Sequence, residues 1–277
     1  MITRSFRFVL KRKLFKGQFR LFSWLLKHNL LLKIKTIGKP VIGNFKLHLN
    51  TKNFIESCIY YTGDYESYLK MHYKKLINPG DIILDIGANI GFHSLYFAEL
   101  TGQNGKVFSF EPIQGNFDAL KENLALNNFP QIFPSNIALG NENARISIYL
   151  DQDAKNPGAY SLLAKGEKNY VIACEKGDDF LKKLGVDHVH FMKIDVEGYE
   201  FEVLKGLENT INKSRPIINF EYDRGYQLKN IDDPNAIFTF LAKKNYQFFS
   251  IDGYSCKTPF IYNDSIQGAE IIAEPIN

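Results

Sequence analysis

The chain has 277 residues, of which 45% are hydrophobic and 23% are charged, a composition typical of a globular protein with a substantial apolar core. Its three cysteines, Cys58, Cys174 and Cys256, are far apart and show no Cys-x-x-Cys spacing, which argues against a disulfide framework and a zinc site and favours a reducing compartment. The net charge of +4 is unevenly distributed, because residues 1–55 contain thirteen Lys/Arg and no Asp or Glu, whereas the rest combines 21 Lys/Arg with 30 Asp/Glu.

The basic N-terminal segment has an amphipathic helical pattern. Apolar residues recur at about one helical turn from Phe6 to Leu32, with basic residues between them and a weak point at Gly17. Its apolar runs are too short for a signal peptide or a transmembrane helix, so we expect a cytoplasmic protein. Three roles remain open for this segment: a helical cover on the domain, peripheral contact with an anionic membrane through residues 1–35, or binding of nucleic acid. Nucleic acid is the least favoured partner, because no RNA-binding module lies beside the segment.

The segment that follows predicts a small hairpin and a broken helix. Phe45, Leu47 and Leu49 alternate along residues 36–49, as in a strand, and residues 54–77 have a helical pattern that Gly63-Asp64 interrupts. Asn78-Pro79-Gly80-Asp81 is strong turn chemistry. We therefore divide the chain into a basic helical and hairpin extension, residues 1–77, and a second domain, residues 78–277.

From residue 82 onward, short apolar runs alternate with helical segments. Residues 144–150 and 170–174 predict a β excursion around a polar loop at 151–168. Buried, non-alternating strands separated by helices predict an α/β fold with a parallel, doubly wound sheet. The strands are expected at 82–86, 106–111, 132–139, 189–195, 216–222, 246–251 and around Ile271-Ile272, and the helices at 92–100, 112–127, 199–211 and 234–244.

A glycine-bearing loop, Asp85-Ile86-Gly87-Ala88-Asn89-Ile90-Gly91, joins the first strand of this domain to its first helix. Glycine permits a tight turn and the close approach of a ligand, and the amides at a helix N-terminus point at whatever binds there. The spacing G-x-N-x-G is not the dinucleotide fingerprint G-x-G-x-x-G, and the G-K-[ST] of a P-loop is absent.

Glu111 ends the next strand, about 20 residues beyond the loop, where a carboxylate is placed to accept hydrogen bonds from a ribose diol. The structural alternative is that Glu111 caps the helix that begins near Pro112.

Further motifs complete an ordered set along the chain. The most specific of them is Lys193-Ile194-Asp195-Val196-Glu197-Gly198-Tyr199-Glu200. The others are Gly63-Asp64-Tyr65-Glu66, residues 79–91, Phe110-Glu111-Pro112, residues 136–140 and residues 203–206. This set, which covers about residues 60–225 and thus over half of the chain, resembles the FkbM-type branch of the class I S-adenosylmethionine-dependent methyltransferases.

This resemblance implies a seven-stranded Rossmann-like sheet whose last strand is antiparallel, with S-adenosyl-L-methionine as the cofactor. It implies that the glycine-bearing loop shapes the methionine end of the site, that Glu111 binds the ribose, and that residues 136–138 lie against the adenine. Glu66 is a weaker cofactor contact. The expected cofactor-binding set is Glu66, Asp85, Gly87, Ala88, Asn89, Gly91, Glu111, Asn136 and Ala138.

Lys193, Asp195 and Glu197 are the candidate catalytic residues. In an extended strand they would point the same way, into the crevice at its carboxyl end. Two carboxylates there could accept a proton from a hydroxyl or hold a divalent cation, while Lys193 keeps them ionised. The structural alternative is that Asp195 and Glu197 cap the helix from Tyr199. Glu221, at the end of the next strand, is a second-tier base, and His93 is expected to be a packing or cap residue.

These residues predict an O-methyltransferase that acts on a hydroxyl of a saccharide, a glycolipid or another small molecule. Amino-methylating nucleic-acid enzymes carry a D/N-P-P-Y/F loop at this place, and Asp195-Val196-Glu197-Gly198 differs from it. The alternatives are an RNA methyltransferase that uses the basic arm and a cofactor-binding protein without catalysis.

Overall fold

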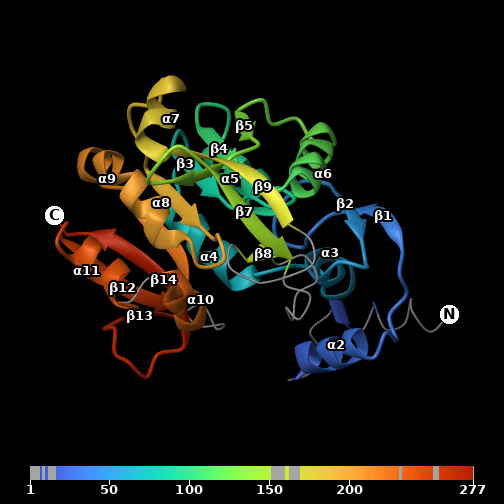
Figure 1. The fold of residues 1–277 in the computed structure, drawn as a ribbon. Helices are drawn as coiled ribbons and strands as arrows, with labels where there is room; N and C mark the ends of the chain where they lie inside the picture. The colour runs from blue at the N-terminus through green and yellow to red at the C-terminus, as the bar shows by residue number, and fades with distance from the viewer. Residues whose placement is uncertain are drawn as a thin grey trace.

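In the computed structural model, a mixed sheet of eight strands forms the centre of the molecule (Figure 1). The model describes residues 7, 10, 11, 17–150, 160–161, 169–230, 233–251 and 256–276. The strand order is β13-β12-β14-β11-β10-β3-β4-β5. The bounds are β3 (Ile82–Ile86), β4 (Lys106–Phe110), β5 (Ile132–Ser135), β10 (Phe191–Ile194), β11 (Ile217–Asp223), β12 (Tyr246–Ile251), β13 (Lys257–Pro259) and β14 (Gly268–Pro275).

The pairing confirms a doubly wound Rossmann-like fold. Strands β5, β4, β3, β10 and β11 pair in parallel, and β14 runs antiparallel between β11 and β12. The antiparallel last strand is as expected. The sheet has one strand more than the seven implied, because the short β13, which the sequence analysis missed, pairs with the edge strand β12.

Helices cover both faces of this sheet. In each strand, neighbouring residues point to opposite faces. Ile83 of β3 and Val107 of β4 pack with α4 (Ser67–Leu76) and α5 (Phe92–Thr101) on one face. The next residues along these strands, Leu84 and Phe108, belong to the core on the other face. Burial on both faces explains the continuous apolar runs of these strands. The remaining helices of the domain are α6 (Gln114–Ala125), α7 (Gly177–Lys183), α8 (Glu200–Gly206), α9 (Glu208–Ser214), α10 (Arg224–Asn230) and α11 (Ala236–Ala242).

The strand expected at 132–139 is wrong as a single element. It divides into β5 of the main sheet and β6 (Ala138–Gly140) of a second sheet, because the Asn136 side chain donates hydrogen bonds to the carbonyl oxygens of Glu111 and Pro112 and turns the chain. The expected β excursion is confirmed: β7 (Ala144–Leu150) pairs antiparallel with β9 (Asn169–Lys176), and also with the two-residue β8 (Tyr160–Ser161). Apart from β8, the polar loop at 151–168 lies outside the described residues.

The helix expected at 199–211 is two helices, α8 and α9. Helix α8 ends at Gly206, where its backbone crosses β6 so closely that a Cβ on this residue would stand 1.8 Å from the carbonyl oxygen of Gly140. Helix α10 was not predicted, although Asp223 at its start accepts a hydrogen bond from the amide of Tyr226, which is an N-cap signal.

The N-terminal segment packs against the main domain. The expected hairpin is present as β1 (Lys35–Gly38) and β2 (Leu47–Asn50), and Phe45, Leu47 and Leu49 enter the same core as Ile83. The expected broken helix consists of α3 (Phe54–Ser57), the π-helix η1 (Cys58–Thr62) and α4. Before the hairpin lies α2 (Gln18–Lys27), which begins after Gly17 as expected. The boundary at residue 78 stays a prediction.

Within the described part of the chain, every helix is too short or too polar to cross a lipid bilayer.

Candidate active site

A cavity of about 540 Å³ lies at the carboxyl ends of the parallel strands. Ten of the thirteen predicted site residues line it. They come from the loops after β3 and β4, from β6, from β10 and the turn after it, from β11, and from the segment before α4. The ten are Glu66, Gly87, Ala88, Asn89, Glu111, Ala138, Lys193, Asp195, Glu197 and Glu221.

The other three predicted residues do not line this cavity. Asp85 is fully buried, and its Oδ2 accepts a hydrogen bond from Ser94 Oγ at 2.5 Å. Gly91 is the N-cap of α5 and lies against Leu120, while Asn136 holds the chain at Glu111. These three residues therefore contact residues next to the cavity and do not face the cavity themselves.

The glycine-bearing loop owes its shape to left-handed backbone conformations. Gly87, Asn89 and Gly91 have φ angles of 86°, 50° and 82°, values that favour glycine and asparagine. The amides of Gly87 and Ala88 both donate to the carbonyl oxygen of Phe110 at 2.9 Å. These bonds fix the loop to the end of β4, directly beside Glu111.

Glu111 is 4% exposed, and both of its carboxylate oxygens accept backbone hydrogen bonds. Oε2 accepts from the amide of Asn89 at 2.8 Å, and Oε1 accepts from the amide of Ile113 at 2.9 Å. Burial nevertheless raises the pKa of Glu111 to about 7. Oε1 also accepts a long hydrogen bond from Asn116 Nδ2 at 3.5 Å. Because a carboxylate has about four acceptor positions, Glu111 keeps one for a ligand, and a second if a ligand hydroxyl displaces Asn116.

Lys193 and Asp195 form an ion pair across the end of β10. The Lys193 side chain is 4% exposed and the Asp195 side chain 36% exposed, with 2.8 Å between Nζ and Oδ2. Burial by itself would lower the pKa of Lys193 and raise that of Asp195. The attraction between the two opposite charges outweighs burial, so the pKa of Lys193 is raised and that of Asp195 is lowered. Both groups are therefore charged at neutral pH.

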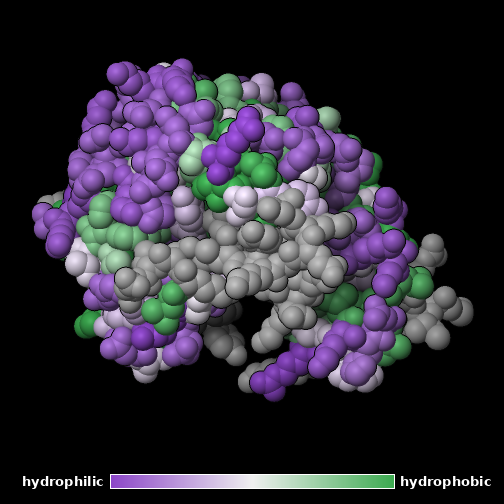
Figure 2. Space-filling model, viewed as in Figure 1, coloured by the Kyte–Doolittle hydropathy of each residue, from purple (hydrophilic) through white to green (hydrophobic). Residues whose placement is uncertain are grey.

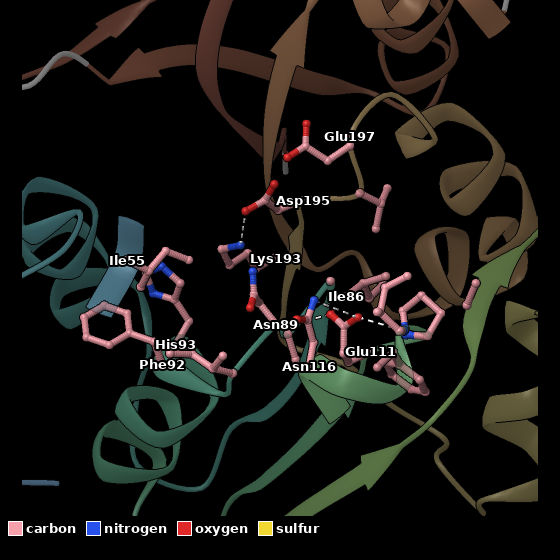
Figure 3. A pocket seen from close by; sticks show the side chains of 18 of the residues that line it. Ile55, Ile86, Asn89, Phe92, His93, Glu111, Asn116, Lys193, Asp195 and Glu197 are labelled. Atoms are coloured by element: carbon pink, nitrogen blue, oxygen red, sulfur yellow. Dashed lines mark hydrogen bonds and ion pairs between the residues drawn. The ribbon is translucent and has the colours of Figure 1, made fainter. Parts of the chain in front are cut away.

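Glu197 does not share a strand face with this pair, which corrects the expectation from the sequence. Strand β10 ends at Ile194, and Glu197 has a left-handed φ of 53° in the turn that follows. Glu197 still lines the cavity (Figure 3), where Asp195 and Glu197 lie on the side away from Glu111 and Asn89. Burial and the charge of Asp195 raise the pKa of Glu197 to about 8, so the expectation that Lys193 keeps both carboxyl groups ionised is wrong for Glu197.

Glu221 completes an acidic wall from β11. Burial, followed by the charges of Asp195 and Glu66, raises its pKa to about 7. Among the described residues, neither Glu197 nor Glu221 has a hydrogen bond or an ion pair through its carboxyl group. Both are therefore free to interact with a ligand.

His93 packs as expected and also contacts a predicted site residue. Its ring lies among Tyr73, Phe92 and Phe97, and its Nε2 lies 2.9 Å from Glu66 Oε2. Asn53, Phe54 and Ile55 line the cavity too. The sequence analysis did not place these three residues in the site, because no local pattern shows that the N-terminal segment folds back over the sheet.

No group of three or more His, Cys, Asp or Glu side chains in the described residues is arranged to hold a metal ion. We therefore derive no step through a divalent cation.

Comparison with known proteins finds similarity to methyltransferases. The sequence model described as "Methyltransferase FkbM domain" matches residues 85–248, more than half of the chain. Hexuronic acid methyltransferase AglP of Haloferax volcanii is 31% identical over 139 residues, which is 50% of this chain and 54% of that protein. 2-O-methyltransferase NoeI of Sinorhizobium fredii is 26% identical over 168 residues, covering 54% of this chain and 68% of that protein.

The matches leave part of each protein uncovered. This chain spans 54%, 60% and 61% of three curated relatives: AglP, Methyltransferase 1 of Beauveria bassiana and methyltransferase sdnD of Sordaria araneosa. A solved structure described as methyltransferase FkbM from Methylobacillus flagellatus has a TM-score of 0.44 and 15% identity, covering 79% of this chain and 52% of that chain.

Proposed function

The chain belongs to the FkbM family of methyltransferases, and from this premise we propose that it transfers a methyl group from S-adenosylmethionine to a hydroxyl oxygen of a saccharide or related small molecule. The observation that carries the proposal is one cavity that holds Glu111 on one side and the Lys193–Asp195 ion pair on the other. One curated relative is named for a hexuronic acid, which supports an acceptor of the sugar class, and another is named a 2-O-methyltransferase, which supports transfer to oxygen.

The residues at the Glu111 end fit the proposed cofactor. Glu111 is held by two backbone amides and keeps one open acceptor position for a ribose hydroxyl, with a second available to the neighbouring hydroxyl if it displaces the long contact to Asn116. The left-handed turns at Gly87 and Asn89 leave these residues on the cavity wall beside it. A volume of about 540 Å³ lies within the usual range for a small-molecule site.

When bound, S-adenosylmethionine supplies an activated methyl group on a positively charged sulfur. The protein must hold the acceptor oxygen in line and receive its proton. Asp195 is ionised and 36% exposed, so its free lone pairs can receive that proton. A low pKa does not prevent this, since a hydroxyl oxygen becomes strongly acidic as it gains the methyl group. Lys193 holds the carboxylate in place.

The acceptor end of the cavity can bind a hydroxyl through its carboxyl groups. Asp195, Glu197 and Glu221 line this part of the cavity, and Lys193 is already paired with Asp195. Because the pKa values of Glu197 and Glu221 are raised to about 8 and about 7, their carboxyl groups are partly protonated near neutral pH, and they can both donate hydrogen bonds to sugar hydroxyls and accept hydrogen bonds from them. Lys193 is held by Asp195 and offers little to an RNA phosphate, so these residues favour a saccharide over RNA.

The test is a methyl-transfer assay with the full chain, labelled S-adenosylmethionine and four acceptor pools: neutral saccharides, the matching uronic acids, lipid-linked glycans and RNA. We expect label in a neutral saccharide or glycolipid pool. Label in RNA would support the nucleic-acid alternative. Cofactor binding without label in any pool would support a non-catalytic protein.

A further inference from the structure

Helix α2 has one face buried in the protein and one exposed to solvent. Phe22 and Leu25 are 0% and 4% exposed and pack with Cys58 and Tyr61, so the helix covers part of the domain. The rest of the helix surface nevertheless carries Phe19, 57% exposed, and Trp24, 53% exposed, on the two sides of the exposed Arg20 and Lys27. Trp24 is the only tryptophan of the chain.

Two further exposed hydrophobic residues follow the end of the helix. Leu30 and Leu32 are 59% and 55% exposed. Single exposed hydrophobic residues are ordinary, but four large ones within fourteen residues indicate a contact surface. We call Phe19, Trp24, Leu30 and Leu32, with the cations between them, the α2 surface. Figure 2 shows hydrophilic and hydrophobic side chains next to one another over α2, at the lower right.

The cations of the α2 surface have no anionic partners within the described residues. Arg20, Lys27 and Lys33 are exposed, and none of them forms an ion pair there. Residues 1–55 contain no Asp or Glu, so no carboxylate from this segment can neutralise them. The positive charge is therefore available to an external anionic surface.

We propose that the α2 surface docks on an anionic lipid bilayer. Phe19, Leu30 and Leu32 would enter the interface between headgroups and acyl chains, with Trp24 at headgroup depth and the cations on lipid phosphates. The hydrophobic side chains favour a bilayer over RNA, because Leu30 and Leu32 gain by leaving water but offer nothing to a phosphate backbone.

Docking brings the cavity wall close to the membrane. The ring centroids of Phe22, on the buried face of α2, and Phe54 are 6.5 Å apart, and Phe54 lines the cavity. The rings of Phe22 and Phe54 therefore connect helix α2 to the wall of the cavity. Docking does not depend on the proposed reaction, so the two can fail independently.

Trp24 provides the measurement, because all tryptophan fluorescence of the chain comes from the α2 surface. The full chain is titrated with vesicles of phosphatidylcholine alone and with vesicles that also contain phosphatidylglycerol. We expect a blue shift of the emission and co-sedimentation with the anionic vesicles only. Both should disappear as added salt shortens the Debye length from about 10 Å to about 3 Å.

Matched variants distinguish binding through the α2 surface from a general effect of net charge. Arg20→Gln with Lys27→Gln should weaken binding to anionic vesicles by roughly 30-fold. Lys74→Gln with Lys75→Gln, which removes two exposed cations of α4, should leave it nearly unchanged. Phe19→Ser with Leu30→Ser should also weaken binding, and all of these side chains are exposed, so circular dichroism should show folded proteins.

Four results would overturn the proposal. They are no binding to either vesicle type, equal binding to both, equal losses in the α2 and α4 charge variants, or displacement of the protein from vesicles by single-stranded RNA at equal phosphate concentration.

Discussion

The carbonyl oxygen of Asp195 occupies the position that a side chain on Gly87 would need. A Cβ built on Gly87 stands 1.9 Å from that oxygen, and the amide of Asp195 donates to the carbonyl oxygen of Ile86 at 3.0 Å. The glycine-bearing loop and the turn with the candidate catalytic carboxylate are thus in direct backbone contact. This contact sets the position of the proposed cofactor relative to Asp195.

We predict that Gly87→Ala abolishes cofactor binding, with Gly80→Ala as the matched control. Both glycines have a φ near +90°, at 86° and 91°, but nothing lies within 4 Å of a Cβ on Gly80. The control should lose only about 1–2 kcal/mol of stability from left-handed strain. Gly87→Ala must in addition push the two loops apart. Calorimetry with S-adenosylhomocysteine would measure this, and equal affinities in the two variants would contradict it.

Glu111 should make cofactor affinity depend on pH. Its pKa is raised to about 7, and hydroxyl donors from a ribose favour the ionised form, so binding must remove a proton below that pH. Affinity for S-adenosylhomocysteine should therefore rise roughly tenfold from about pH 6 to about pH 8. Glu111→Gln should flatten this dependence, and Glu111→Ala should weaken binding by about 1–3 kcal/mol. A folded Glu111→Gln protein with the native pH profile would remove Glu111 from the cofactor site.

Glu200 is predicted to shape the turn that carries Glu197. It is 2% exposed, and its carboxylate accepts from the amides of Val196 and Gly198, at 3.2 Å and 3.1 Å, and from Gln227 at 2.6 Å. Burial raises its pKa from 4.5 to about 7. The unfolded chain releases this proton first, so the contribution of Glu200 to stability falls as pH rises from 4.5 to about 7, by up to about 3 kcal/mol.

Denaturant unfolding at several pH values tests this prediction. In Glu200→Gln, the free energy of unfolding should decline less between about pH 5 and about pH 7, because the variant has no carboxyl group at this position to titrate. The variant should stay folded, since its amide can donate to the Gln227 oxygen once the Gln227 amide rotates. Glu200→Ala should be less stable at every pH, since two amides lose their acceptor. Identical pH slopes in the wild type and Glu200→Gln would show that Glu200 does not titrate in this range.

Asp195 is the residue on which turnover should depend most. Asp195→Asn keeps the shape, removes the charge and should lower the turnover number by about 10²–10⁴-fold at saturating cofactor. Cofactor affinity should change much less. The variant also leaves Lys193 without its carboxylate, so Lys193→Met combined with Asp195→Asn is the control. If Asp195 accepts the proton, the double variant stays slow, whereas recovered turnover would mean that Asp195 only neutralises Lys193.

Local patterns predicted the elements that pack in a regular way. Apolar runs identified the strands at 82–86 and 106–111 and the helix at 92–100. A strand that is buried on both faces of the sheet has a continuous apolar sequence, which is easily recognised. The turn at Glu197 could not be found in this way, since period-2 alternation does not show where a strand ends and φ becomes positive. The prediction of one strand at 132–139 failed because of two long-range hydrogen bonds, from the Asn136 side chain back to the carbonyl oxygens of Glu111 and Pro112.

The same distinction holds for the site. Motifs in the loops after β3, β4 and β10 placed Gly87, Glu111 and Asp195 at one sheet edge, where parallel strands bring their carboxyl ends together. Phe54 lines the cavity because of the tertiary packing of the N-terminal segment, which no spacing in the sequence reports.

The most direct test of the central claim is to locate the transferred methyl carbon. The full chain is incubated with S-adenosylmethionine labelled with ¹³C at the methyl group and with the acceptor found in the assay above, and the product is mapped by NMR. The proposed function predicts a methyl ether, with the labelled carbon coupled through oxygen to one ring carbon and stable to mild alkali. A labelled carbon on nitrogen, or on a carboxyl group as an alkali-labile ester, would contradict it.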